Sequence, residues 1–142
     1  LDNFKPLNDL YGHKVGDLLL IEVARRISGC VREIDTVARF GGDEFVVMLS
    51  DLDVDKAEST VQAGIVAEKI RAMLAEPYLL KPTQEGKAEG FAVEHRCTSS
   101  IGAVLFLNHD AGPEDILKWA DMAMYQAKSD GRNLIRFFNP LP

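Results

Sequence analysis

The segment Arg39-Phe40-Gly41-Gly42-Asp43-Glu44-Phe45 decides how this chain is interpreted. Apolar runs rich in β-branched and aromatic residues flank it at 36–40 and 45–49, which predicts two strands. The Gly-Gly pair between them predicts a tight hairpin, because glycine takes positive φ without steric cost. Such a turn lifts Asp43 and Glu44 to the rim of a sheet. Two adjacent carboxylates there either stay solvated in an acidic turn or bind a hard cation such as Mg²⁺.

Length and charge restrict the classes of function. At 142 residues the chain is long enough for one domain with a real core. It carries 16 Lys and Arg against 22 Asp and Glu, a formal net charge of −6. Such a chain is a poor nonspecific partner for a nucleic-acid polymer or an anionic membrane, so we expect neither contact. A polyanionic ligand would need a local cluster of cations or a bound metal.

The cysteines and histidines indicate neither a disulfide framework nor a zinc site. Cys30 and Cys97 are isolated, and His13, His95 and His109 lack metal-ligand spacing. Isolated cysteines are typical of a reducing cytosol. No apolar run approaches the ~20 residues of a membrane span, and no signal peptide is visible. We therefore expect a cytoplasmic domain, either free or as the cytoplasmic part of a membrane-anchored sensor.

The first part of the chain predicts a polar loop and then a helix. Residues 1–9 are typical of a strand end followed by a turn, and no strand precedes them. A helix is expected from Val15, because apolar residues recur every three or four positions. Its apolar face comprises Leu20, Val23, Ile27, Val31 and Ile34. Asp17 fits an N-cap or first-turn acid of this helix, and Arg32 and Asp35 fit a surface ion pair at its far end.

The rest of the chain predicts two further helices and several strands. A second helix is expected at 56–75, before Pro77. Its apolar face comprises Val61, Ile65, Val66, Ile70 and Met73. Further strands are expected at 78–80, 91–96, 98–107 and 134–138, with an exposed loop at 81–90. The strands on either side of Cys97 are predicted to pair, and Gly102 marks a close backbone approach. A third helix starts at Pro113 and stops at Gly131.

This order of elements predicts an α+β fold with a mainly antiparallel central sheet flanked by helices. One more strand is implied before Leu1. With that strand the core is βαββαβ, the ferredoxin-like or palm arrangement, followed by an extra C-terminal helix and strand. We therefore expect a single domain over residues 1–142, truncated at its N-terminus and lacking its first strand.

Several familiar catalytic motifs are absent from the sequence. It contains no G-x-x-x-x-G-K-[ST] phosphate loop, no G-x-G-x-x-G fingerprint and no G-x-S-x-G nucleophile elbow. The remaining polar features are the carboxylate turn, the loop at 1–9, and the cations Lys128 and Arg132 after the third helix. On a palm these can converge, because carboxylates hold Mg²⁺, the ion holds a triphosphate, and cations neutralise its far end.

Together these motifs resemble the GGDEF family, the bacterial diguanylate cyclases. Residues 41–45 are similar to the family signature. The segment 1–9 resembles D-[LI]-D-x-F-K-x-x-N-D without its first Asp, residues 12–17 resemble G-H-x-x-G-D, and residues 125–133 resemble Y-x-A-K-x-x-G-R-N. The resemblance covers essentially the whole chain, and the combination of motifs is highly specific.

The resemblance implies that the protein condenses two GTP molecules into cyclic di-GMP and two pyrophosphates, with Mg²⁺ or Mn²⁺ as cofactor. Each domain binds one GTP, so a second GGDEF domain must face the first in a homodimer. The implied catalytic residues are Asp43 and Glu44, and the implied metal ligands are Asp43, Glu44 and the backbone carbonyl of Leu1. The implied GTP-binding residues are Asn3, Phe4, Lys5, Asn8, Asp17, Lys128 and Arg132. A further metal-binding Asp of the family would fall immediately before Leu1.

The chemistry of Asn8 and Asp17 suits guanine. A carboxylate accepts hydrogen bonds from N1–H and the exocyclic amine, while an amide both donates and accepts. A palm-type nucleotidyltransferase that acts on another nucleotide fits these two side chains less well.

The resemblance also gives Arg32 and Asp35 a second interpretation. Five residues separate Asp35 from Gly41, which is the spacing of the family's inhibitory product site. There an Arg side chain can grip a guanine edge or a phosphate of cyclic di-GMP. Lys69, on the second predicted helix, is a candidate additional cation at that site.

A catalytically silent domain is the alternative to an active cyclase. Such a domain would bind GTP or cyclic di-GMP and control an attached phosphodiesterase (EAL) domain. The intact 41–45 motif, Lys128 and Arg132 favour the enzyme. The segment 136–140 is similar to the sequence that leads into an EAL domain in other members of the family. EAL and sensory domains are therefore candidate attached partners.

Overall fold

Four helices and six strands make up the described part of this computed structural model, residues 1–81, 92–107 and 111–138. The helices are α1 (Phe4–Tyr11), α2 (His13–Ser28), α3 (Lys56–Ala75) and α4 (Pro113–Ser129). The strands are β1 (Thr36–Gly41), β2 (Glu44–Met48), β3 (Tyr78–Leu80), β4 (Val93–His95), β5 (Ile101–Ala103) and β6 (Ile135–Phe137). Apart from Lys81, the loop expected at 81–90 lies outside the described residues. No helix in the described ranges has both the length and the hydropathy that a membrane crossing needs.

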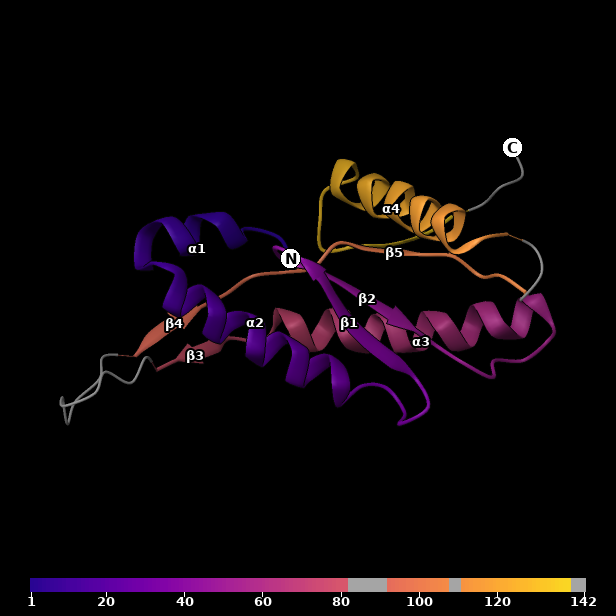
Figure 1. The fold of residues 1–142 in the computed structure, drawn as a ribbon, viewed down its shortest axis with the longest axis horizontal. Coiled ribbons are helices and arrows are strands. Elements are labelled where there is room, and N and C mark those ends of the chain that lie inside the picture. Colours follow the sequence, from indigo (N-terminus) through magenta and orange to yellow (C-terminus); the bar gives the residue numbers. More distant parts are fainter. Residues whose placement is uncertain (82–91, 108–110, 139–142) are drawn as a thin grey trace.

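The strands pair in three ladders of two. β1 with β2 and β3 with β4 are antiparallel, whereas β5 and β6 are parallel. The predicted α+β class with mainly antiparallel pairing is confirmed, although the ladders of the described residues are separate rather than joined in one central sheet. The predicted pairing of 91–96 with 98–107 is wrong. A single residue between these segments is too short for a hairpin turn, so they continue as one extended stretch (Figure 1).

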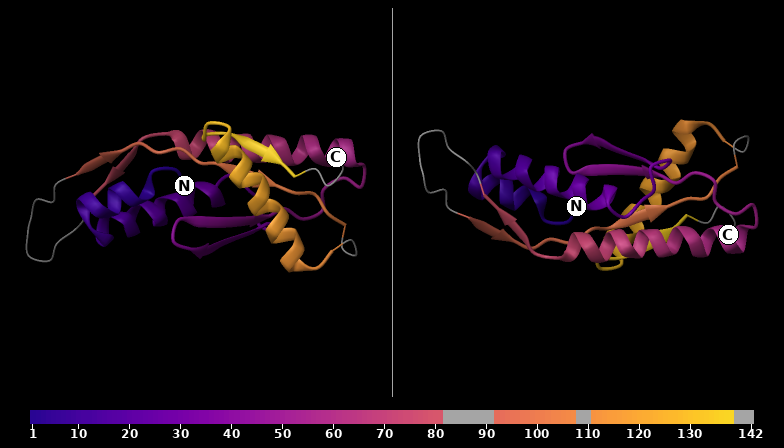
Figure 2. Two further views of the ribbon diagram at one scale, coloured as in Figure 1. Left: turned by 90° about the horizontal axis from the view of Figure 1, so that it is seen from above. Right: turned by 90° about the horizontal axis from the view of Figure 1, so that it is seen from below.

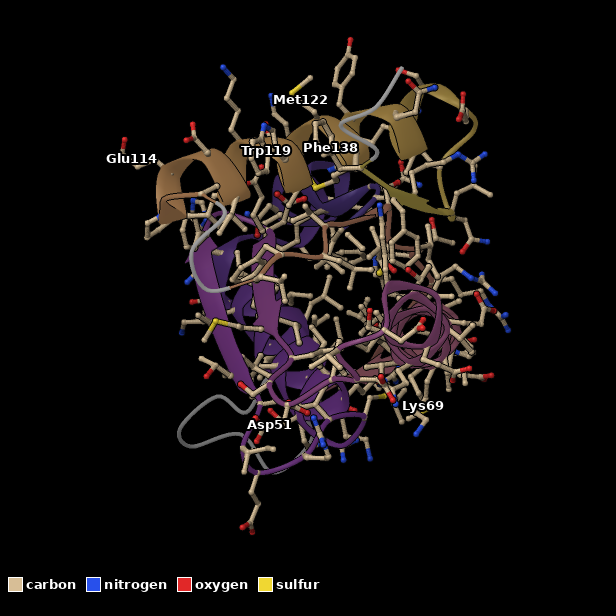
Figure 3. The ribbon with its side chains drawn as sticks, turned by 90° about the vertical axis from the view of Figure 1, so that its right-hand side faces the viewer. Asp51, Lys69, Glu114, Trp119, Met122 and Phe138 are labelled. Carbon is tan, nitrogen blue, oxygen red and sulfur yellow. The ribbon has the colours of Figure 1, made fainter. Side chains whose placement is uncertain are left out.

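Two helices enclose the parallel pair. α4 lies on one side of β5 and β6, and α3 contacts the same strands from the other side (Figures 1 and 2). Trp119 of α4 stacks on Phe138, with ring centroids 5.4 Å apart and planes 6° apart (Figure 3). This stacking holds Phe138, the residue that follows β6, against α4.

Gly102 in β5 lies where the backbone of α4 comes very close, as predicted. A Cβ at this position would lie 2.1 Å from the backbone oxygen of Ala120 and 2.3 Å from the backbone nitrogen of Met124. Glycine is therefore required here, unless α4 moves away from the strand.

The core lies between α2, the C-terminal half of α3 and the β3–β4 pair. Its buried members are Leu7, Val15, Leu19, Val23, Ile27, Cys30, Ile70, Leu74, Tyr78, Leu80, Val93 and Cys97. Both cysteines are free thiols, and burial raises the pKa of each. They therefore behave as small apolar side chains of the core.

Arg26 of α2 joins this core to the end of α3. Its guanidinium donates to the carbonyl oxygens of Met73, Glu76 and Pro77 at 2.8–2.9 Å and lies 3.7 Å from the centre of the Tyr78 ring. Carbonyls at a helix C-terminus lack intrahelical partners, so a cation from another helix satisfies them. The sequence predicted where this helix stops, but not this partner, because Arg26 lies 47 or more residues away along the chain.

The start of the chain is helical, contrary to prediction. Residues 4–11 form α1, because Phe4 and Leu7 pack against the core and Pro6 lies in the first turn, where no amide N–H is needed. α2 then begins at His13 after the cap residue Gly12. Asp17 therefore lies in the second turn of α2 and is not its N-cap.

α2 also ends earlier than predicted. It stops at Ser28, so Val31 and Ile34 lie beyond the helix, and Ile34 is exposed. Gly29 caps the helix, and the Asp35 carboxylate then accepts hydrogen bonds from backbone amides and closes a separate turn. Arg32 and Asp35 consequently belong to this turn and not to the end of the helix.

α3 has the predicted bounds, and of its predicted apolar face only Ile70 is buried while Val66 packs against the core. Asp55 is its N-cap and accepts from the amides of Ala57 and Glu58 at 2.8 and 3.1 Å. The buried residues of α3 are Ser59, Ala63, Ala67, Ile70 and Leu74, whereas Val61, Ile65 and Met73 are exposed. The helix is apolar on two sides, and the small residues allow closer approach to its neighbours. The tertiary partner therefore selects the buried face.

Candidate functional site

A cavity of about 280 Å³ lies where the N-terminal segment, the β1–β2 turn and the end of α4 meet. We call it the cationic cavity. Its lining residues are Leu1, Asp2, Asn3, Phe4, Lys5, Pro6, Asp43, Lys128 and Arg132. The fold thus brings together seven predicted site residues from three separate stretches of sequence. The other five predicted site residues do not line this cavity; they are Asn8, Asp17, Arg32, Asp35 and Glu44.

The β1–β2 turn presents Asp43 to the cationic cavity. Gly42 and Asp43 are the turn residues, rather than the predicted Gly41 and Gly42, because Gly41 still pairs with Glu44. Gly42 has a left-handed φ of 54°, which suits a tight hairpin. Its carbonyl accepts a hydrogen bond from Arg39 Nε at 2.9 Å, which stiffens the turn.

Leu1 lies directly beside Asp43. The Leu1 nitrogen donates to the Asp43 backbone oxygen at 3.1 Å and lies 3.6 Å from the Asp43 carboxylate. Glu44, the first residue of β2, is exposed. Asp43 therefore lines the cavity, whereas Glu44 does not line it and is exposed.

Three cations line the cationic cavity. Lys5 comes from the first turn of α1, Lys128 from the last turn of α4, and Arg132 from the residues just beyond α4. The chain as a whole carries a charge of −6, so this is a local concentration of positive charge. Such a cluster suits an anion with several phosphates.

Asp2 anchors the N-terminal wall of the cavity, a role that sequence reasoning missed. Its carboxylate accepts hydrogen bonds from the Thr98 and Ser100 hydroxyls at 2.6 and 2.8 Å and from the backbone N–H of Asn133 at 3.3 Å. Burial raises the pKa of Asp2, but these hydrogen bonds outweigh it and hold the pKa below its ordinary value. Asp2 is therefore an ionised structural anchor. The sequence offered one signal for this role, since Asp2 is a polar residue at a predicted strand end within the 1–9 motif.

A second space, which we call the α2 hollow, lies between α2 and the β1–β2 hairpin. It measures about 460 Å³ and is lined by Asp17, Leu20, Ile21, Ala24, Arg39 and Phe45. Apolar walls with one carboxylate and one guanidinium suit a planar ring with polar edges. The hairpin therefore contributes to both sites, through Asp43 to the cationic cavity and through Phe45 to the hollow.

Asn8 packs against α2 beside Asp17. A Cβ on Gly16 would lie 1.8 Å from Asn8 Oδ1, so glycine makes room for the amide. This oxygen is buried, and no described residue donates a hydrogen bond to it. A buried acceptor without a partner is costly, and a donor on a ligand would satisfy it.

Arg32 and Asp35 tie the start of β1 to the end of β2. The Asp35 carboxylate accepts from the amides of Arg32 and Ser50 at 2.8 and 3.0 Å and pairs with the Arg32 guanidinium at 3.3 Å. Burial raises the pKa of Asp35, but the hydrogen bonds from Ser50 and Arg32 bring it below its usual value. The Arg32 side chain stays 54% exposed, so part of its guanidinium faces solvent.

Lys69 projects from α3 on the side away from α4 (Figure 3). Burial raises the pKa of the Cys30 thiol, and the charge of Lys69 offsets part of that effect. Cys30 precedes Arg32 by two residues, so Lys69 lies toward the Arg32–Asp35 turn.

The donors beside the cationic cavity fit a hard cation. The Asp43 carboxylate and the Leu1 carbonyl are oxygen ligands of the kind that Mg²⁺ and Mn²⁺ prefer. Within the described ranges, no group of three or more His, Cys, Asp or Glu side chains is arranged to hold a metal. The fit is therefore to an ion that takes other oxygens from a phosphate ligand and from water, as Mg²⁺ commonly does.

Two relatives resemble this chain along nearly all of its length. The bifunctional diguanylate cyclase/cyclic di-GMP phosphodiesterase MucR of Pseudomonas aeruginosa is 41% identical over 138 residues, which cover 97% of this chain and 18% of MucR. The cyclic di-GMP phosphodiesterase NbdA of the same organism is 38% identical over 139 residues, which cover 98% of this chain and 16% of NbdA. The chain thus spans only a small part of either relative.

A solved structure and a family model cover the site itself. The crystal structure of the GGDEF domain of TpbB (YfiN) from Pseudomonas aeruginosa superposes with a TM-score of 0.77 at 40% identity, over 97% of this chain and 77% of that one. Residues 1–134 match the family described as diguanylate cyclase, GGDEF domain, and this range takes in every residue that lines the cationic cavity. The chain belongs to the GGDEF domain family.

Proposed function

We propose that this chain is one half of a diguanylate cyclase, which condenses two GTP molecules into cyclic di-GMP and two pyrophosphates. The observation that carries the proposal is the cavity that Asp43 lines together with the cations Lys5, Lys128 and Arg132. Oxygen donors and cations around one cavity suit a metal-bound triphosphate. Membership of the GGDEF family and the name of MucR support the same chemistry.

The residues of the cationic cavity bind the triphosphate. Lys128 and Arg132 neutralise the terminal phosphates through charge-assisted hydrogen bonds. Asn3, Phe4 and Lys5 line the phosphate path at the start of α1, where free backbone amides favour anions. Asp43 and the Leu1 carbonyl would hold Mg²⁺ or Mn²⁺. When bound, the ion neutralises the charge that develops on the pyrophosphate leaving group.

Asn8 and Asp17 bind the guanine. The Asp17 carboxylate accepts from N1–H and the exocyclic amine, and the unpaired Asn8 oxygen gains a donor from the base. Leu20 and Phe45 supply apolar contacts to its ring. Guanine is preferred because adenine presents an acceptor where guanine presents N1–H.

Two domains complete the reaction. The 3′-hydroxyl of the GTP on one domain attacks the α-phosphorus of the GTP on the other, in line with the departing pyrophosphate. The new O3′–P bond forms as the bond from the α-phosphorus to pyrophosphate breaks, and the hydroxyl proton passes to water. The reciprocal attack by the second 3′-hydroxyl on the other α-phosphorus closes the ring in the same way and releases the second pyrophosphate. Glu44, exposed on the same hairpin, is our candidate for contact with the second nucleotide.

The second candidate is a silent domain that binds GTP or cyclic di-GMP and regulates an attached phosphodiesterase. It is favoured by the names of NbdA, a cyclic di-GMP phosphodiesterase, and of MucR, a bifunctional enzyme. Both the cyclase and the silent domain bind a guanine nucleotide, so the formation of cyclic di-GMP from GTP distinguishes between them.

Incubation of the full-length protein with GTP and Mg²⁺ is expected to yield cyclic di-GMP and pyrophosphate. The rate per chain should rise with protein concentration, because two domains must meet. Chelation with EDTA should abolish turnover, and added Mg²⁺ or Mn²⁺ should restore it. Chromatographic separation of the nucleotides measures each effect. Absence of cyclic di-GMP at concentrations where the protein is dimeric, with GTP still bound, would support the regulatory candidate instead.

Arg32→Ala is expected to weaken inhibition by cyclic di-GMP by about tenfold, because the exposed guanidinium is the proposed contact for the product. Lys69→Ala should act in the same direction and more weakly. Initial rates measured at increasing cyclic di-GMP give the inhibition constants. Arg96→Ala is a suitable control, since Arg96 is an exposed cation paired with Glu94 on another part of the surface. Equal inhibition of wild type and Arg32→Ala would exclude Arg32 from the product site.

A further inference from the structure

The residues after α4 adopt a turn that is unusual for their chemical type. Gly131, Arg132 and Asn133 have φ values of 126°, 64° and 53°. Glycine takes this region freely and asparagine tolerates it, but arginine adopts it only when the surroundings impose it. The backbone that carries Arg132 to the cationic cavity is therefore held by contacts outside itself.

The helix end accounts for the first part of this turn. The Gly131 amide donates to the Lys128 carbonyl at 3.4 Å, and the Arg132 amide donates to the Ala127 carbonyl at 3.0 Å. These two bonds form a Schellman motif with Gly131 at its left-handed position. The motif closes α4 but leaves Asn133, the next left-handed residue, to be fixed by other groups.

Two hydrogen bonds to separate parts of the chain hold Asn133. The backbone N–H of Asn133 donates to Asp2 Oδ2 at 3.3 Å. Its side-chain oxygen accepts from Arg71 Nη1 at 2.7 Å. The guanidinium of Arg71 is itself oriented by Glu68, one turn earlier on α3, through a bond from Nε at 2.8 Å. Asn133 therefore links the N-terminal wall of the cavity to α3.

Arg71 reaches this turn because β6 and the residues before it run alongside α3 (Figure 2). Only 24% of the Arg71 side chain is exposed. Arg71 is not among the residues that line the cationic cavity. The hydrogen bond to Asn133 is therefore the contact that connects Arg71 to the turn carrying Arg132.

We propose that Arg71 is a positioning residue, which acts through Asn133 to hold the left-handed turn that presents Arg132 to the terminal phosphates of the nucleotide. This role rests on the proposed function. Arg132 has a long side chain with much rotational freedom, so its backbone must be fixed for its guanidinium to meet a phosphate in one geometry. Loss of the Arg71 contact frees the turn and selectively weakens binding of the triphosphate.

The test compares two nucleotides that cannot react. 3′-Deoxy-GTP lacks the attacking hydroxyl and retains the terminal phosphates, whereas 3′-deoxy-GMP lacks those phosphates. Arg71→Met removes the donors and keeps the apolar stem. It is expected to weaken binding of 3′-deoxy-GTP about tenfold while leaving 3′-deoxy-GMP unchanged, measured by titration calorimetry with Mg²⁺.

A matched control exists on α2. Arg25 forms the same type of pair, with a Glu three residues earlier, and its side chain is exposed. Arg25→Met should leave the affinity for both nucleotides unchanged. Arg71→Lys keeps one donor and should restore part of the triphosphate affinity. If Arg71→Met does not fold, Asn133→Gly removes the same contact while permitting the left-handed backbone, and the same selective loss is expected.

A double substitution shows whether the effect passes through Arg132. In an Arg132→Met background, Arg71→Met should cause no further loss of 3′-deoxy-GTP affinity, because the group it positions is already absent. Additive losses, equal losses for both nucleotides, or an unchanged affinity would each overturn the positioning role. If wild type binds neither nucleotide, the proposed function itself fails, and this role with it.

Discussion

Asp43→Asn is expected to reduce cyclic di-GMP formation at least about 100-fold while leaving the fold intact. The asparagine amide has nearly the shape of the carboxylate, and the hydrogen bond from the Leu1 nitrogen goes to the Asp43 backbone oxygen, which is unchanged. The substitution removes the negative charge that would hold Mg²⁺. Asp2, the other carboxylate at the cavity, is buried and already bonded to three groups, so it cannot take over this role.

The measurement is the rate of product formation at saturating GTP, with circular dichroism to check the fold. Asp121→Asn is the matched control, because Asp121 is an exposed carboxylate on α4 that does not line the cationic cavity. It should turn over GTP like wild type. A rate for Asp43→Asn within a few-fold of wild type would remove Asp43 from the metal site.

Gly102→Ala is expected to destabilise the domain by about 3 kcal/mol, because its methyl group would overlap three backbone atoms of α4. Backbone atoms within a helix cannot move singly, so the whole helix must shift. For a chain of this size, such a loss lowers the midpoint of thermal unfolding by roughly 10 °C. Because α4 carries Lys128, activity should fall below the level that the loss of folded protein explains.

Gly64→Ala provides the control with the opposite sign. Gly64 lies within α3, and apart from its two chain neighbours and the nearby backbone of the helix itself, no atom lies within 4 Å of the position that its Cβ would take. Alanine is the better helix former by about 0.5–1 kcal/mol, so this variant should unfold at a higher temperature. Calorimetric scans of both variants test the pair. A Gly102→Ala variant as stable as wild type would mean that α4 is not packed against β5 in this way.

Local signals in the sequence predicted much of the secondary structure. The stop before Pro77 predicted the end of α3 and Pro113 the start of α4, whereas the cap at Asp55 was seen only in the structure. Each of these signals acts over a few residues, through one amide or one fixed dihedral angle. The segment 4–11 carries no such cap, and its helix forms because Phe4 and Leu7 gain a buried partner.

The sequence also identified seven of the nine residues that line the cationic cavity, because the family motifs mark them. It did not identify Asp2 as an anchor. A carboxylate near the N-terminus is ordinary until Thr98, Ser100 and Asn133 are brought to it from almost 100 or more residues away. Motifs report which residue types a site needs, whereas the hydrogen bonds that support them depend on the approach of distant segments.

The sequence by itself determined the family, the carboxylate turn and the helix-end cations, because these depend on residue type and short spacing. Only the tertiary structure decided that Gly42 and Asp43 form the turn, that Asp43 but not Glu44 lines the cavity, which face α3 buries, and that Arg71 reaches Asn133. The physical reason is the range of the interactions. Capping and turn preferences act within a few residues, whereas burial and long-range hydrogen bonds exist only once the chain has brought separate segments together.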